Sequence, residues 1–320
     1  GRNSHLIHHD DEQTVSNSQK LNRMQAQYAA FGAQRLRRIM SNGNRYMAPS
    51  ESELKAVAER MPFIVRFETM DGNTKALTVD SATTIGEIYH SLARRMLLQD
   101  PRGWEIFSVF NDLERSLNAD DKVGDELLKI ERLQAVEKQD EKMVDAVLDR
   151  RGYRFVFKRK LHLDPRIISP DPVENTLVFH QIKEEYLLGL LPLSFEDALK
   201  LGALLLQHTK GDYKQEEIDA ERERIRKENA SRETGIYDSE LEQQPIVIDI
   251  FSYLPQTLID ASDRLEHEWQ ADLLEVHKAL MGYSRTASMA LFLRAAKRLP
   301  LFGSTLFRVQ HRSNWDMPAS

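Results

Sequence analysis

The 320-residue chain has no cysteine, so no site in it can depend on a thiolate. Disulfides, thiolate zinc sites, iron–sulfur clusters and cysteine nucleophiles are therefore excluded. Long apolar runs are also missing: the longest covers residues 186–193, whereas a membrane span needs about 20 apolar residues. The first residues, Gly1-Arg2-Asn3-Ser4, contain neither a starting Met nor an apolar signal-peptide core. We therefore expect a cytoplasmic fragment of a longer protein.

The short motifs that mark many enzymes are absent as well. We find no G-x-x-x-x-G-K-[ST], G-x-G-x-x-G, H-E-x-x-H or G-x-S-x-G. His180 and His208 lie inside apolar helical segments, where a structural role is expected, and the His-rich start of the chain has no ligands at helical spacing to complete a metal site. The sequence thus predicts a protein that is not an enzyme and that has no catalytic residue, no cofactor and no metal.

Charge and size set two further bounds. The net charge is −6, which argues against a general nucleic-acid binder, because such proteins carry a large basic excess. Hydrophobic residues make up 41% of the chain, enough to form packed cores. Since single cores stop growing at about 250–300 residues, two or three domains are expected.

The N-terminal part predicts a polar, disordered tail over 1–19 and a helix over about 21–40. Apolar residues recur there at helical spacing: Leu21, Met24, Tyr28, Phe31, Leu36 and Ile39. Asn42-Gly43 is a helix stop, and Ser50 with Glu53 predicts a capping box for a second short helix. The apolar face needs a partner, which we expect either downstream or outside this sequence.

Residues 61–134 read as a small mixed domain. Alternation at 63–68 predicts a strand, Asp71-Gly72 a hairpin turn, and 76–79 the second strand. Thr84 and Glu87 predict a second capping box at the start of a helix, and 104–110 a third strand. Hairpin, helix and further strands in this order are typical of a β-grasp, ubiquitin-like lobe.

The rest of the chain predicts a helical bundle. A charged linker is expected at 135–151, and a second lobe at 152–303 that opens with a basic strand near 153–158. Apolar stripes at 173–208 and 246–303 indicate packed helices, one of them capped by Ser194. A charged insertion at 214–242, with ten acidic and six basic side chains, predicts a solvated, partly helical arm. The predicted fold class is therefore α+β and multi-lobed.

Two segments are basic although the chain is acidic. Residues 20–60 carry eight basic and three acidic side chains, and residues 149–166 carry seven and two, a net of +5 in each case. Such clusters can attract acidic lipid, the acidic surface of tubulin or acidic peptides; the alternative is salt bridging between the lobes and ordinary surface charge. The candidate partner-binding residues are Arg35, Arg37, Arg38, Arg45, Arg154, Lys158, Arg159 and Lys160.

Several stretches resemble a known family. The helix at 198–207, Gly211-Asp212-Tyr213 after it and Tyr186-Leu187-Leu188-Gly189 before it resemble the second lobe of FERM domains. The ubiquitin-like part resembles the first FERM lobe, and 300–309 is similar to the passage into the third. Residues 28–53 resemble the end of a myosin tail homology 4 domain and its junction to FERM.

This resemblance implies the tail of an unconventional myosin of class seven, ten or fifteen, with an acyl-CoA-binding-protein-like second lobe. Residues 20–60 would be the terminal helix of the preceding helical domain and its junction, and 304–320 the start of a truncated third lobe. The implied function is non-catalytic binding of cargo or adaptor proteins, and of microtubules, acidic phospholipid or the motor head, at the cytoskeleton, the cell cortex or filopodia. The alternatives are a membrane–cytoskeleton adaptor of the band 4.1 or talin type and a FERM regulatory module of a signalling enzyme.

Overall fold

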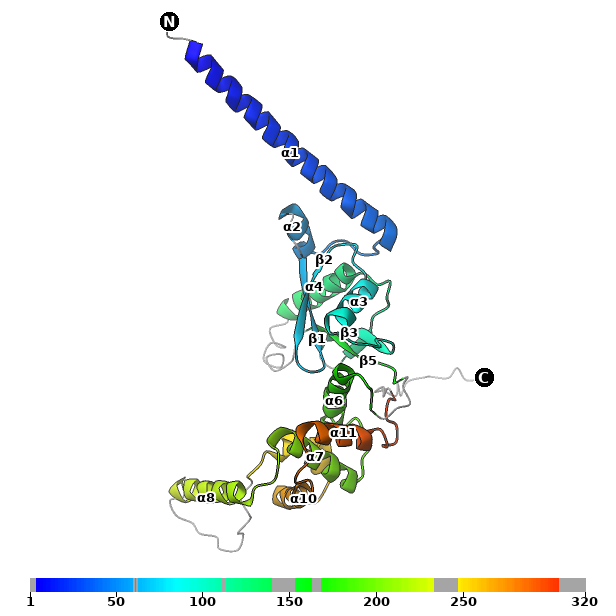
Figure 1. Ribbon diagram of the computed structural model, residues 1–320, viewed down its shortest axis with the longest axis vertical. Helices are drawn as coiled ribbons and strands as arrows, with labels where there is room; N and C mark the ends of the chain where they lie inside the picture. Colours follow the sequence, from blue (N-terminus) through cyan, green and yellow to red (C-terminus); the bar gives the residue numbers. More distant parts are fainter. Residues whose placement is uncertain are drawn as a thin grey trace, which may run out of the picture. The chain divides into compact units, whose positions relative to one another are not determined.

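The computed structural model describes residues 4–59, 61, 63–110, 113–139, 153–162, 168–232 and 247–304. The chain divides into two compact units. The first takes its residues from 1–69, 73–96 and 105–157, and the second from 70–72, 97–104 and 158–320. Figure 1 shows the helices and strands of both units with their labels.

A five-stranded sheet with the order β2-β1-β5-β3-β4 organises the first unit (Figure 1). Its strands are β1 (Phe63–Thr69), β2 (Thr74–Val79), β3 (Trp104–Phe110), β4 (Leu113–Ser116) and β5 (Arg154–Arg159). β1 and β2 form an antiparallel pair, and so do β3 and β4. β1 and β5 form a parallel pair. The hairpin predicted at Asp71-Gly72 is confirmed, and Gly72 has a φ of 79°, which a glycine adopts without strain.

Alternating apolar residues form the core of this unit. Val65 and Phe67 of β1 are buried, and the Phe67 ring lies 5.3 Å from the ring of Phe155 on β5. α3 (Ile85–Arg95) contributes Ile88 and Leu92 to the core, and α4 spans Val123–Gln139. The capping box predicted for α3 is present in full. Each large apolar side chain buried in this way contributes about 1.5–3 kcal/mol.

One predicted boundary is wrong. The basic strand expected to open the second lobe is β5, which lies in the sheet of the first unit beside β1, with Phe67 opposite Phe155 and Thr69 opposite Phe157. Both faces of its backbone carry large apolar side chains, so the strand suits a central position in a sheet. The predicted linker begins inside α4, and its residues 140–151 lie outside the described residues.

The N-terminal helix is longer than predicted. α1 spans Ser4–Asn42, so the expected disordered tail is helical from Ser4 onward. No Pro or Gly interrupts residues 4–31, which allows the helix to continue through a polar segment. α2 (Glu51–Glu59) follows after a short loop.

Only the C-terminal end of the apolar stripe on α1 is covered by described residues. Phe31 and Ile39 are partly buried, whereas Leu21, Tyr28 and Leu36 remain about half exposed, at 54%, 49% and 58%.

The second unit is a helical bundle, as predicted. Its helices are α6 (Pro172–Leu187), α7 (Phe195–Lys210), α8 (Gln215–Arg232), the 3₁₀ turn η1 (Ile250–Ser252), α9 (Gln256–Asp260), α10 (Glu266–Lys278) and α11 (Arg285–Ala296). α7 packs against α10 and α11, and α11 also packs against α6. Phe179, Tyr186, Trp269 and Phe292 are almost fully buried. These aromatic residues form the core, and Ser194 caps α7 as expected.

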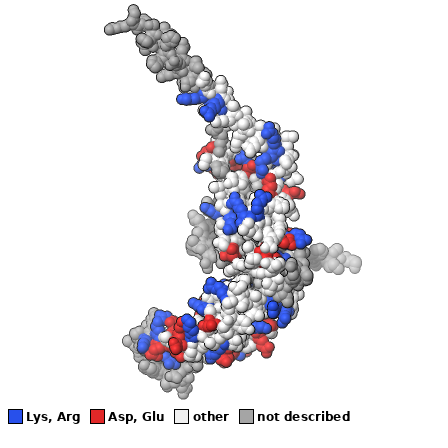
Figure 2. Space-filling model, viewed as in Figure 1, with Lys and Arg blue, Asp and Glu red and all other residues white. Residues whose placement is uncertain are grey.

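The predicted charged arm begins with α8. It carries charged side chains of both signs, and Figure 2 shows acidic and basic groups interspersed over it. The predicted pair of Glu223 with Lys227 is present at 3.4 Å, whereas the pair of Glu228 with Arg232 lies outside the described side chains, as do residues 233–242 of the arm. Among the described residues, no helix is long and apolar enough to cross a bilayer.

Candidate interaction surface

Arg45 is a buried ion-pair centre rather than a surface charge. Its Nε lies 2.7 Å from Oδ1 of Asp125, and its Nη1 lies 2.5 Å from Oε1 of Glu53. The three side chains are 14%, 10% and 4% exposed. Burial tends to lower the pKa of Arg45, but its hydrogen bonds to Glu53 and Asp125 outweigh this and raise it. Arg45 therefore holds the junction loop and α2 against α4.

The capping box predicted at Ser50 is only half formed, because Glu53 binds Arg45. The hydroxyl of Ser50 accepts a hydrogen bond from the backbone N–H of Glu53 at 3.2 Å. The carboxylate of Glu53 binds Arg45, so it does not reach back to the start of the helix. Farther along the same contact, Ser52 donates to Glu131 of α4 at 2.7 Å.

Arg35 and Arg38 share one carboxylate. Nη1 of Arg35 lies 2.8 Å, and Nε of Arg38 2.7 Å, from Oδ2 of Asp80. Neither contact has the geometry of a hydrogen bond, so these two buried nitrogens have no hydrogen-bond partner. Arg38 also donates through Nη2 to Glu87 at 2.9 Å. Burial, reinforced by the charge of Arg38, lowers the pKa of Arg35.

The other side of this contact is held by the loop after β2. Oδ1 of Asp80 accepts hydrogen bonds from the backbone of Ala82 and from the hydroxyl of Thr83, both at 3.0 Å. This leaves Oδ2 for the arginines. Arg37, between them in sequence, lies on the exposed side of α1.

The second basic cluster is also divided by the fold. Arg154 pairs with Glu68 at 2.9 Å within the first unit. In the second unit, Arg159 is buried and forms an ion pair with Glu174, while its Nε donates to the backbone of Leu161 at 3.0 Å. The side chain of Lys160 is exposed, and that of Lys158 is partly exposed.

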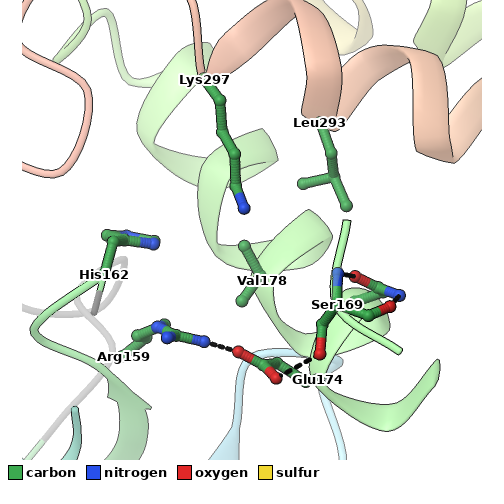
Figure 3. Close-up of a pocket in the computed structure, with 8 residues that line it drawn as sticks. Arg159, His162, Ser169, Glu174, Val178, Leu293 and Lys297 are labelled. Atoms are coloured by element: carbon green, nitrogen blue, oxygen red, sulfur yellow. Dashed lines mark hydrogen bonds and ion pairs between the residues drawn. The ribbon is translucent and has the colours of Figure 1, made fainter. Parts of the chain in front are cut away.

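A small polar cavity lies beside the pair of Arg159 and Glu174 (Figure 3). Its volume of about 10 Å³ suits one water molecule and no larger ligand. His162 borders it and packs against Phe302, with the ring centroids 4.7 Å apart and the ring planes tilted by 52°. Burial, with the nearby charges of Arg159 and Lys297, lowers the pKa of His162 from 6.5 to about 4.

The eight candidate residues thus differ in how far the fold buries them. Arg35, Arg38, Arg45, Arg154 and Arg159 have carboxylate partners within the chain. Arg37 and Lys160 are exposed, and Lys158 is partly exposed. Most of the carboxylates lie far away in sequence, so a local charge count could not find them. Within the described part of the chain, no group of three His, Asp or Glu side chains is placed to hold a metal ion.

Comparison with known proteins places both units. The FERM central domain family matches residues 169–307, and the RA-like domain family matches residues 61–161, which include β5. The myosin-I heavy chain of Dictyostelium discoideum is 32% identical over 189 residues, covering 57% of this chain and 8% of that protein. Myosin-VIIa of Drosophila melanogaster is 29% identical over 156 residues, 48% of this chain and 7% of that protein. The chain therefore spans less than a tenth of the length of these relatives.

Comparison with solved structures gives the same result as the comparison of sequences. The MyTH4–FERM MF1 domain of Dictyostelium discoideum myosin VII is similar with a TM-score of 0.61 and 25% identity, covering 84% of this chain and 47% of that one. The C-terminal MyTH4–FERM domain of human myosin 7b, solved with a PDZ domain of harmonin, shares the fold with a TM-score of 0.59 and 21% identity; the match covers 89% of this chain and 52% of that one.

These findings define the fold: residues 169–307 match the FERM central domain, and the sheet-containing unit before them completes a multi-lobed FERM fold. More narrowly, it is similar to myosin tails and to the MyTH4–FERM domain of myosin VII. The start of a third lobe, expected at 304–320, lies outside the described residues from 305 onward.

Proposed function

We propose that the chain is the cargo-binding and regulatory tail segment of an unconventional myosin, and that it acts by binding other proteins without catalysis. The observation that carries the proposal is the FERM central domain at 169–307 together with the likeness to the myosin VII MyTH4–FERM structure over 84% of the chain. In such a segment, rigid lobes present surfaces to partners while an actin motor lies elsewhere in the parent protein. The myosin 7b structure was solved with a protein partner, a PDZ domain, which supports this class of ligand.

The proposed partners are cargo or adaptor proteins first, and microtubules, acidic phospholipid or the motor head of the same protein second. The corresponding location is the cytoskeleton, including the cell cortex or filopodia. The electrostatic partners need accessible positive charge, and among the candidate residues Arg37, Lys158 and Lys160 offer it best.

Affinity purification of the parent protein from its own cells, with cross-linking and mass spectrometry, tests the main proposal. We expect adaptor or cargo proteins cross-linked to residues of either unit, and their recombinant forms to bind the purified chain directly. If recombinant candidates show no binding to the chain at moderate salt, the proposal fails.

Co-sedimentation tests the secondary partners. Microtubules or vesicles with anionic lipid are mixed with the wild-type chain and with K158Q/K160Q, which changes charge at accessible positions and leaves the buried pair of Arg159 and Glu174 intact. Loss of co-sedimentation in the variant supports polyanion binding at this cluster. Equal co-sedimentation of both proteins excludes polyanion binding at this cluster.

A further inference from the structure

A groove separates the C-terminal part of α1 from the edge of the sheet in the first unit. It has a volume of about 420 Å³, within the roughly 300–1,000 Å³ typical of ligand-binding clefts. Phe31, Arg35 and Arg38 of α1 line one side. Residues 78–80 of β2 and the loop after it, with Thr83 and Met61, line the other.

The groove has an apolar part and a charged part. Phe31 and Met61 supply apolar surface, and Met61 is 56% exposed, whereas Val79 is only 4% exposed. The guanidinium of Arg35 lies over the Phe31 ring, 5.0 Å from its centroid. Its lining contains two arginines and one aspartate, a local charge of +1; Glu87, which binds Arg38, does not line the groove. A ligand with one negative charge would therefore complement it.

Both arginine side chains of the lining are partly exposed, at 23% for Arg35 and 35% for Arg38, although one nitrogen of each is buried against Asp80. Nη1 of Arg35 and Nε of Arg38 form ion pairs with Asp80, at 2.8 and 2.7 Å, without hydrogen-bond geometry. A ligand carboxylate would therefore bind the exposed parts of the two arginine side chains, beside their contact with Asp80.

The backbone of β2 offers a second set of contacts. β2 ends the strand order of the described sheet, so one of its edges has no neighbouring strand. The backbone N–H of Thr69 donates to the carbonyl of Asn73 at 2.9 Å, so Thr69 and Asn73 form a hydrogen-bonded pair of the antiparallel ladder. Because such pairs alternate along an antiparallel ladder, the pairs at Lys75, Leu77 and Val79 are hydrogen-bonded, whereas Ala76 and Thr78 point their N–H and C=O away from β1. The side chain of Arg95 donates to the carbonyl of Ala76 at 2.9 Å, in agreement with this assignment.

We infer that this groove binds an extended segment of a partner protein, which adds a strand to β2 at Thr78 and places an acidic side chain on Arg35 and Arg38. Main-chain pairing with Thr78 supplies the strand-addition contacts, and the arginine pair selects the side chain. The inference rests on the proposed protein-binding function and narrows it to the chemistry of one partner segment.

The experiment uses a display library of random seven-residue peptides, selected on the full chain. We expect selected peptides to share one Asp or Glu, with apolar residues two positions away on the same face of a strand. Changing that acid to its amide should weaken binding about 10- to 100-fold, because a charge-assisted hydrogen bond is worth about 1.5–3 kcal/mol. R35Q/R38Q should abolish this difference, whereas R37Q on the same helix should leave it unchanged.

Backbone pairing is tested on the peptide, so that the protein fold is not disturbed. N-methylation of each peptide bond in turn should reduce binding at every second position, since only alternate N–H groups of a strand face β2. The variant T78P removes one outward N–H of β2 and keeps the hydrogen bonds between β1 and β2. T78A is its control, and circular dichroism checks that both variants are folded.

The possible failures are distinct. The proposed binding site in the groove is wrong if the selected peptides share no acidic residue. It is also wrong if they bind wild type and R35Q/R38Q equally. N-methylation effects without alternation overturn the strand addition. In each case protein partners that bind the chain elsewhere would leave the proposed function standing, because its test does not depend on this groove.

Discussion

Replacing Arg45 with Met should strongly destabilise the first unit. The change leaves the carboxylates of Glu53 and Asp125, only 4% and 10% exposed, close together without their cation. Removing one partner of a buried ion pair typically costs about 3–5 kcal/mol. For a unit of this size, 1 kcal/mol shifts Tm by about 2–4 °C, so we expect a loss of about 6–20 °C.

Hydrogen exchange measured by mass spectrometry can assign this loss to one unit. Peptides from β1 and α4 should exchange faster in R45M, whereas peptides from α7, in the second unit, should be unchanged. R37M is the matched control, because Arg37 is exposed and its replacement should change stability by less than about 0.5 kcal/mol. The triple variant R45M/E53Q/D125N should recover much of the loss, since it also removes the uncompensated charges. A loss below about 1 kcal/mol in R45M would refute the role given to this cluster.

Three further predictions concern the second unit. G202A should cost about 1–3 kcal/mol in urea unfolding, because its Cβ would lie 2.8 Å from the carbonyl oxygen of Tyr253; G32A, with open space around it, should not destabilise. Y186F should cost about 1–2 kcal/mol, since the buried hydroxyl contacts two carbonyl oxygens at 2.9 Å; an unchanged unfolding midpoint would contradict this. His162 has a pKa of about 4 in the folded chain against 6.5 when unfolded, so the unfolded state takes up the proton first as pH falls. Wild type should therefore lose at most about 3 kcal/mol relative to H162N between pH 7 and pH 4, and parallel pH profiles would contradict it.

Local signals in the sequence predicted the elements well. The Thr84–Glu87 capping box, the Ser194 cap and the hairpin at Gly72 each depend on residues within a few positions of one another, and all are present. The resemblance to FERM domains gave the order of the lobes. The position of β5 could not be found in this way, because nothing local to Tyr153–Arg159 says that its neighbour is β1, more than 80 residues earlier.

The candidate site shows the same limit for charges. The sequence singled out eight basic residues by counting charge in short windows, but most of the carboxylates that bind them come from outside those windows. Arg45 binds Asp125, 80 positions later, and Arg154 binds Glu68, 86 positions earlier. A window with a net charge of +5 therefore does not present a field of that strength to a partner.

What remains for recognition in the first cluster is geometry more than charge. Asp80 already occupies the space between Arg35 and Arg38, so a diffuse polyanion gains little there that the protein does not supply itself. The exposed parts of the two arginine side chains line the same groove as Thr78, whose backbone N–H and C=O point away from β1. A ligand must satisfy both at once, which an extended acidic segment can do and a lipid headgroup or a flexible acidic tail cannot do as well. Binding in this groove should therefore follow the sequence and backbone of the ligand, whereas binding at Lys158 and Lys160 should follow ionic strength.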